Sequence, residues 1–167
     1  EYDEPKKLKK QGCYPYFIPF SGGDDNVMNY NGDEKIMIGS NSYLGLTHHP
    51  RVVEAAKKAT EEYGTGRTGS RFLNGTLDIH EEFEQELADF IGKEAALVFS
   101  AGYLVNLGVI SSLVGRNDYL ILDRLDHASI VDGSLLSRAN ILRYKHNDLE
   151  DLENKLKQVP DDAGAMI

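Results

Sequence analysis

The segment 95–115, AALVFSAGYLVNLGVISSLVG, restricts the fold more than any other part of this chain. It contains no charged residue, and Gly102 divides it into a strand-length run at 95–100 and a helix-length run at 103–114. A buried strand that leads through a glycine turn into a helix leaves backbone N–H groups available at the start of the helix. Such groups are a ready site for a phosphate. The spacing predicts that Gly102 and Tyr103 form this turn; an ordinary strand–helix turn is the alternative.

An uncharged stretch of this length also fits a transmembrane helix. We expect two separate buried elements instead, because three glycines and polar residues interrupt the stretch, among them Ser100, Asn106 and Ser111.

The net charge of −9 argues against a nucleic-acid binder, which would need a basic surface. Cys13 is the single cysteine, so no internal disulfide is possible, and we expect a reducing compartment, the cytoplasm.

Strand-like and helix-like segments alternate through the second half of the chain. We expect strands at 95–100, 119–123 and 141–144, and helices at 103–114, 127–137 and 148–157. This alternation predicts an α/β fold with right-handed crossovers and a mostly parallel sheet. The residues 164–167 look like the start of another buried strand, so we expect the chain to be the N-terminal part of a longer polypeptide, or one piece of a cleaved one.

The first part of the chain, residues 1–49, is expected to form an arm and a β-hairpin. Its segment 14–20 is aromatic and interrupted by prolines, so it cannot be a regular helix, and we expect it to pack on another subunit or on the rest of the fold. The hairpin is predicted from Asn31-Gly32-Asp33, which lies between 27–30 and 35–38. Residues 50–167 are expected to belong to a large domain that begins with helices at 50–63 and 77–91.

The predicted ends of the strands carry the candidate functional side chains. His127 follows the strand 119–123, where an imidazole can stack on a heteroaromatic ring or bind a carboxylate. The alternative is a histidine at a helix start that Asp126 caps. Asn41 and Ser42 could bind a substrate carboxylate, although ordinary turn chemistry explains them as well. Asp132 and Gly133 are expected to serve helix packing, and His146, in the segment 145–148, to be part of a helix cap.

The glycine-rich loop 64–71 matches the dinucleotide spacing G-x-G-x-x-G, but a helix is expected before it where the fingerprint needs a strand. Its backbone and the guanidinium groups of Arg67 and Arg71 could instead approach an anion. No metal site is predicted, because His48 and His49 are too closely spaced and no Cys or carboxylate cluster joins them.

Taken together, seven motifs resemble those of one enzyme family in order and spacing. They are Asn41-Ser42-Tyr43-Leu44-Gly45-Leu46, Gly64-x-Gly66-x-x-Gly69-Ser70-Arg71, Asn74-Gly75-Thr76, Phe99-Ser100-Ala101-Gly102-Tyr103, Asn106, His127-Ala128-Ser129 and His146-Asn147-Asp148. The family is the α-oxoamine synthases, pyridoxal 5'-phosphate (PLP) enzymes of fold type I that condense an amino acid with an acyl-CoA and release carbon dioxide. The resemblance implies the first half of an aminotransferase-like large domain.

The segments 14–17, 69–76 and 127–133 most resemble bacterial serine palmitoyltransferases. That resemblance implies L-serine and a long-chain acyl-CoA as substrates; glycine C-acetyltransferase and 8-amino-7-oxononanoate synthase are the alternatives. It also implies a homodimer and is compatible with a peripheral membrane contact. The implied roles are cofactor contacts from Gly102 and Tyr103, ring stacking and substrate contact from His127, and substrate binding by Asn41 or Ser42.

One departure from the family pattern concerns lysine. The family's Schiff-base lysine lies well downstream, and none of the eleven lysines here has the expected sequence context. We therefore expect either that the lysine lies in sequence outside this chain, or that the chain is a non-catalytic partner subunit.

Overall fold

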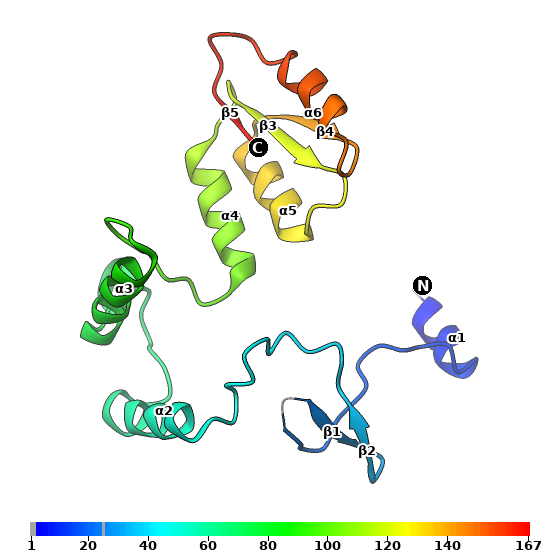
Figure 1. Cartoon of the computed structure of the whole chain (residues 1–167), viewed down its shortest axis with the longest axis vertical. Coiled ribbons are helices and arrows are strands. Elements are labelled where there is room, and N and C mark those ends of the chain that lie inside the picture. Colours follow the sequence, from blue (N-terminus) through cyan, green and yellow to red (C-terminus); the bar gives the residue numbers. More distant parts are fainter. Residues whose placement is uncertain (1–2, 25) are drawn as a thin grey trace. The chain divides into compact units, whose positions relative to one another are not determined.

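The structure is a computed structural model that describes residues 3–24 and 26–167. The chain divides into two compact units (Figure 1). The first unit ends at Gly75 and the second begins at Thr76. The domain boundary predicted after residue 49 concerns the longer protein and stays a prediction.

The first unit begins with helix α1, Glu4–Lys10, which the sequence analysis did not anticipate. Pro5 occupies the first turn, where its missing N–H costs nothing. Glu4 lies at the start and three lysines lie in the last turn, so the charges match the helix dipole. Part of the predicted arm is therefore a short helix that its own charges stabilise.

The aromatic segment after α1 is irregular, as predicted. The ring of Phe20 lies 6.1 Å from that of Tyr30, so this end of the segment packs on the unit's own hairpin. Phe17, in contrast, is 91% exposed and has a φ of 56°. The expected contact with another subunit stays a prediction.

The predicted β-hairpin consists of β1, Val27–Tyr30, and β2, Asp33–Ile36. Tyr30 pairs with Asp33, so the loop has only two residues, Asn31 and Gly32, with φ values of 52° and 87°. Two consecutive positive φ angles define the type I′ turn that suits the twist of a hairpin. The second strand therefore begins at Asp33, two residues before the predicted start.

Helix α2 spans Pro50–Tyr63, the predicted range, and Gly64 follows it with a φ of 80°. The glycine-rich loop comes next and leads into a single π-helical turn, η1, Arg71–Gly75. Because α2 and not a strand precedes the loop, the context required of a dinucleotide fingerprint is absent from this part of the chain.

The second unit is an α/β layer built on a parallel sheet. Its elements are α3, Asp78–Ile91; α4, Gly102–Leu113; β3, Tyr119–Asp123; α5, Ala128–Ser137; β4, Asn140–Tyr144; α6, Leu149–Leu156; and β5, Ala165–Met166. The strand order is β4-β3-β5, with β3 parallel to both neighbours. This arrangement confirms the predicted α/β class and the parallel sheet, including the strand near the end of the chain.

The core of this unit lies between α4 and the central strand. Leu120 and Leu122 of β3 are 1% and 4% exposed, and they cluster with Ile110 and Val114 at the end of α4. Helices α4 and α5 pack side by side (Figure 1). This packing brings together the starts of two helices that are separated by a strand in the sequence.

The predicted strand at 95–100 is not formed. The segment joins neither the β1-β2 sheet nor the β4-β3-β5 sheet. The backbone N–H of Val98 instead donates to the Glu84 carboxylate of α3 at 2.8 Å. An apolar run becomes a strand only where a neighbouring strand takes its backbone hydrogen bonds, and none of the strands in residues 3–24 and 26–167 does so.

Candidate functional site

The start of α4 carries the predicted phosphate turn. Ala101, the residue before the helix, is extended and has no side-chain acceptor, so no side chain caps the first turn. The Ala101 carbonyl accepts from the N–H groups of Leu104 and Val105, at 3.0 and 3.2 Å. A Cβ atom added at Gly102 would meet nothing within 4 Å, which leaves space beside the N–H groups of Gly102 and Tyr103. This uncapped helix start fits a phosphate group.

The start of α5 carries His127, which is itself the N-cap residue. Its Nδ1 atom accepts a hydrogen bond from the backbone N–H of Ser129 at 3.2 Å. The alternative in which Asp126 caps the helix is therefore wrong, because the imidazole of His127 occupies that position. The His127 ring lies 6.1 Å from the Tyr103 ring at an angle of 74°, an edge-on contact. Two predicted site residues from different helices thus meet.

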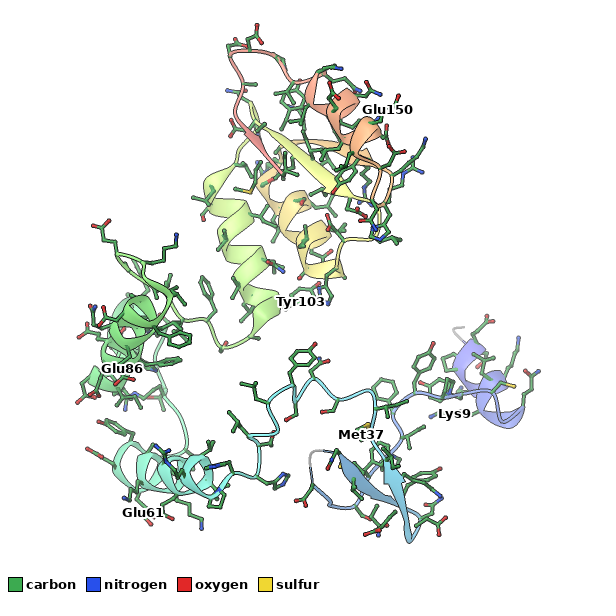
Figure 2. All side chains as sticks on the ribbon, in the orientation of Figure 1. Lys9, Met37, Glu61, Glu86, Tyr103 and Glu150 are labelled. Atoms are coloured by element: carbon green, nitrogen blue, oxygen red, sulfur yellow. The ribbon has the colours of Figure 1, made fainter. Side chains whose placement is uncertain are left out.

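A second contact joins the same two helix starts. The Tyr103 hydroxyl, in the first turn of α4 (Figure 2), donates a hydrogen bond to the Asp132 carboxylate of α5. This bond raises the pKa of the Tyr103 phenol above its ordinary value of 10.0, and burial and the Asp132 charge act in the same direction. The phenol therefore stays protonated at neutral pH and holds its ring beside His127. Asp132 serves this bond in addition to the packing that the sequence predicted.

The close approach of α4 and α5 depends on Gly133. A Cβ atom at this position would lie 2.8 Å from the Asn106 carbonyl oxygen and 3.3 Å from Cβ of Ile110. The packing role that the sequence predicted for Gly133 is confirmed. Only a residue without a side chain permits the contact that brings Tyr103 to Asp132.

A hydrogen-bond chain that the sequence analysis did not find runs from α4 to His127. The Asn106 side-chain amide donates to the Ser129 hydroxyl at 2.8 Å, and that hydroxyl lies 2.7 Å from His127 Nδ1. Ser129 is 1% exposed. Both residues belong to the quoted motifs, but 23 positions separate them, and only the packing of α4 on α5 makes them neighbours.

A separate polar cluster lies at the ends of β3 and β4. Asp123 accepts hydrogen bonds from the Leu125 N–H at 2.8 Å and from the His146 ring at 3.1 Å. His146 is thus not the helix cap that the sequence predicted; Asp148 caps α6 by accepting from the Asp151 N–H at 2.9 Å. The Leu125 N–H, and after it the His146 ring, hold the pKa of Asp123 below its ordinary value, against the opposing effect of burial.

The lowered pKa of Asp123 predicts how stability depends on pH. The unfolded carboxyl has a pKa near 3.8, so the folded state gains stability above that pH and loses it as the pH falls through the lower, folded-state value. As the pH is lowered past about 4, we expect the urea concentration at the unfolding midpoint to decrease. The decrease should be less steep in Asp123→Asn. Asp161→Asn, which removes one exposed carboxylate, is the control for the change in net charge. An unchanged acid limb in Asp123→Asn would contradict the prediction.

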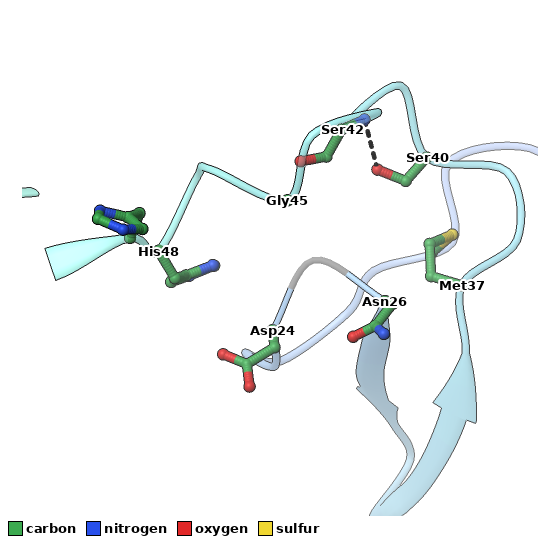
Figure 3. A pocket seen from close by; sticks show the side chains of 8 residues that line it. Asp24, Asn26, Met37, Ser40, Ser42, Gly45 and His48 are labelled. Carbon is green, nitrogen blue, oxygen red and sulfur yellow. Dashed lines mark hydrogen bonds between the residues drawn. The ribbon is translucent and has the colours of Figure 1, made fainter. Parts of the chain in front are cut away.

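Asn41 and Ser42, the predicted substrate-binding residues, belong to the first unit. The Ser42 N–H donates to the Ser40 hydroxyl at 3.0 Å, and the hydroxyls of Ser42 and Thr47 are 3.1 Å apart. The turn chemistry that the sequence offered as the alternative is therefore present. Ser42 also lines a cavity of about 500 Å³ (Figure 3), whose other lining residues are Asp24, Asn26, Met37, Ser40, Gly45, His48 and His49. The substrate role of Asn41 and Ser42 stays a prediction.

Residues 3–24 and 26–167 contain no group of three or more His, Cys, Asp or Glu side chains placed to hold a metal ion. None of the helices found there combines the length and the apolar character that a membrane span requires.

Comparison with known proteins identifies the class of this chain. Residues 33–167 match the model of the aminotransferase class I and II family, so the chain belongs to that family. Among curated relatives, the serine palmitoyltransferase of Sphingobacterium spiritivorum is 52% identical over 162 residues, which cover 97% of this chain and 41% of the relative. The 8-amino-7-oxononanoate synthase of Geobacter sulfurreducens is 47% identical over 155 residues, 93% of this chain and 40% of the relative.

Solved structures agree with this assignment. A serine palmitoyltransferase from S. paucimobilis with a bound PLP–myriocin aldimine has a TM-score of 0.92 at 41% identity, covering 97% of this chain and 42% of that one. The Sphingomonas wittichii serine palmitoyltransferase also has a TM-score of 0.92, at 44% identity, covering 97% and 41%. The resemblance to PLP-dependent acyltransferases is thereby confirmed. The chain spans about 41% of the length of the Sphingobacterium spiritivorum relative.

Proposed function

We propose that this chain is the N-terminal part of a PLP-dependent acyltransferase that joins L-serine to a long-chain acyl-CoA. The reaction forms a carbon–carbon bond between the serine α-carbon and the acyl carbonyl, and it releases carbon dioxide and free CoA. The product is a 3-keto sphingoid base. Identities of 52% to serine palmitoyltransferases from two genera support this substrate class.

The observation that carries the proposal is the meeting of two helix starts at one end of the α4–α5 pair. One supplies uncapped N–H groups at Gly102 and Tyr103, and the other supplies the imidazole of His127. A phosphate group beside a flat aromatic ring is the chemistry that this combination accommodates. PLP has both parts.

Each residue then has a defined task. The N–H groups of Gly102 and Tyr103 hold the phosphate, and the His127 ring supports the pyridine ring and reaches the substrate carboxylate. Asn41 or Ser42 is assigned a substrate-binding role as well. When bound, PLP supplies the electron sink that stabilises a carbanion at the amino-acid α-carbon. The protein's contribution is to orient the substrate and to surround it with hydrogen-bond donors.

We place the Schiff-base lysine outside this chain. Of the two lysines nearest the site in sequence, Lys93 follows α3 and Lys145 follows β4, and the Lys145 ammonium lies 3.9 Å from the Asp148 carboxylate.

The proposed enzyme is a homodimer in the cytoplasm, which light scattering and cell fractionation of the full-length protein would test. Fractionation would also reveal a peripheral membrane contact.

A second candidate function is 8-amino-7-oxononanoate synthesis. It is favoured by the 47% identity over 155 residues to the Geobacter sulfurreducens enzyme. The product's name defines a nine-carbon chain with a terminal acid, so the acyl donor would be dicarboxylic. The two functions therefore differ in the acyl-CoA that they accept.

The test is a substrate matrix with the full-length protein and added PLP. L-Serine, L-alanine and glycine are each paired with palmitoyl-CoA, a dicarboxylic acyl-CoA and acetyl-CoA, and CoA release is measured. We expect turnover with serine and palmitoyl-CoA at least about tenfold above every other pair. Preference for alanine with the dicarboxylic donor would favour the second candidate, and preference for glycine with acetyl-CoA a glycine C-acetyltransferase. Absence of both CoA release and a visible PLP absorbance change with serine would favour a non-catalytic partner subunit.

A further inference from the structure

We propose that Asn106 and Ser129 are positioning residues that hold His127 in the tautomer with its proton on Nε2. The proposal rests on the proposed function only for the identity of the ligand that Nε2 meets. The tautomer itself follows from hydrogen bonds within this chain. One atom of this network can act only as a donor.

That atom is the backbone nitrogen of Ser129, whose N–H can only donate. It lies 3.2 Å from His127 Nδ1, so Nδ1 must present its lone pair, and the proton of the neutral ring is on Nε2. The Ser129 hydroxyl, 2.7 Å from the same Nδ1, must then donate as well. The Ser129 oxygen in turn accepts from the Asn106 amide at 2.8 Å. All three bonds run in one direction, toward Nδ1.

Burial makes this direction stable. Ser129 is 1% exposed, so water has almost no access with which to replace a lost partner of its hydroxyl. A buried polar group without a hydrogen bond costs free energy, which disfavours any arrangement that breaks one of the hydrogen bonds between Asn106, Ser129 and His127. The other tautomer would place a proton on Nδ1 against two donors. The network therefore stabilises one tautomer of an exposed imidazole from its buried side.

A second histidine in the chain shows that capping alone does not need this network. His49 is the N-cap of α2, and its Nδ1 accepts from the Arg51 N–H at 3.3 Å. The backbone cap is thus the same at both histidines, with the N–H two residues ahead as the donor. At His127 two further groups join this cap, the buried Ser129 hydroxyl and the Asn106 amide of α4. These additions have a function beyond capping the start of a helix, which we assign to fixing the tautomer and orientation of the His127 ring.

The consequence concerns the outer edge of the ring. With Nδ1 occupied, Nε2–H is a donor, and it can bind a carboxylate or another anionic oxygen. In the opposite tautomer, Nε2 would present a lone pair that repels such a group. Asn106 and Ser129 therefore make His127 a donor toward an anionic ligand without touching that ligand.

The decisive variant is Asn106→Asp, which keeps the shape but replaces the amide donor by an acceptor. The Ser129 hydroxyl should then donate to the new carboxylate instead of to Nδ1, so that only the 3.2 Å bond from the Ser129 backbone N–H still disfavours a proton on Nδ1. The full-length protein is prepared with isotope-labelled histidine, and the ring nitrogen and carbon shifts are measured without PLP or substrate. The His127 signal is assigned by its loss in His127→Asn. We expect Nε2–H in the wild type and a shift toward Nδ1–H in Asn106→Asp.

Ser134→Ala is the matched control. Like Ser129, Ser134 is a buried serine of α5 and is 0% exposed. Its hydroxyl, however, donates to the Ile130 carbonyl of the same helix at 2.6 Å. The variant should keep the Nε2–H signal of His127. If PLP is then added, Asn106→Asp should raise the KM for L-serine about tenfold, as expected for one lost hydrogen bond to a charged group, with a smaller change in kcat.

The outcomes separate the two proposals. An Nδ1–H signal in the wild type overturns the positioning role and needs no variant, so the test survives if Asn106→Asp does not fold. An unchanged tautomer in folded Asn106→Asp overturns it too. If the tautomer population shifts as expected while the wild type transfers no acyl group, the positioning role stands and the proposed function fails.

Discussion

Replacement of His127 by Asn is expected to reduce turnover of the full-length protein by about 10²-fold, the size of effect that a lost positioning group produces. Asparagine is among the best N-cap residues, so the variant keeps an acceptor for the Ser129 N–H while it removes the ring. The unfolding temperature should therefore remain close to that of the wild type. Steady-state CoA release and thermal unfolding measure the two quantities.

The companion variant His127→Ala removes the ring and the cap together. It should lose as much turnover as His127→Asn, and in addition about 0.5–2 kcal/mol of unfolding free energy, the usual cost of an N-cap lost to alanine. The pair thus separates catalysis from helix stability. Turnover near the wild-type rate in His127→Asn would exclude the proposed role of the ring.

The fold was predictable where local signals agree with one another. Pro50 and Gly64 limit α2 on both sides, and the predicted range matches the observed one. The strand β3 was predictable as well, because an apolar run between polar turns has few alternatives. The segment 95–100 has an equally apolar pattern but joins no described sheet. Whether such a run becomes a strand depends on a neighbour, and no local pattern encodes the neighbour.

The site was predictable in its backbone and less so in its side-chain partners. Gly102, Tyr103 and His127 follow from positions at helix starts. Their connections do not, because Tyr103 meets Asp132 across 29 positions, and the register of α4 on α5 decides that pairing. His49 and His127 also have the same local structure, since each is the N-cap of a helix and its Nδ1 accepts from the N–H two residues ahead. The Ser129 hydroxyl and the contacts from α4 distinguish them.

Gly133→Ala is expected to destabilise the second unit by about 1–3 kcal/mol, the usual cost of overpacking a well-packed contact. The added methyl group would lie 2.8 Å from the Asn106 carbonyl oxygen, a backbone atom that moves only if α4 moves. Alanine is intrinsically the better helix former by up to about 1 kcal/mol, so local propensity predicts the opposite sign. Chemical unfolding monitored by circular dichroism decides between the two.

Gly115→Ala is the matched control for this prediction. Its Cβ would meet only the Asp118 carboxylate, at an ordinary distance of 3.9 Å, and we expect its unfolding free energy to stay within about 0.5 kcal/mol of the wild type. Gly133→Ala should also weaken PLP binding in the full-length protein, because a displaced α4 moves Tyr103 away from Asp132 and Asn106 away from Ser129. Wild-type stability in Gly133→Ala would show that the two helices adjust without cost. The close approach of α4 and α5 would then not be what sets the geometry around His127.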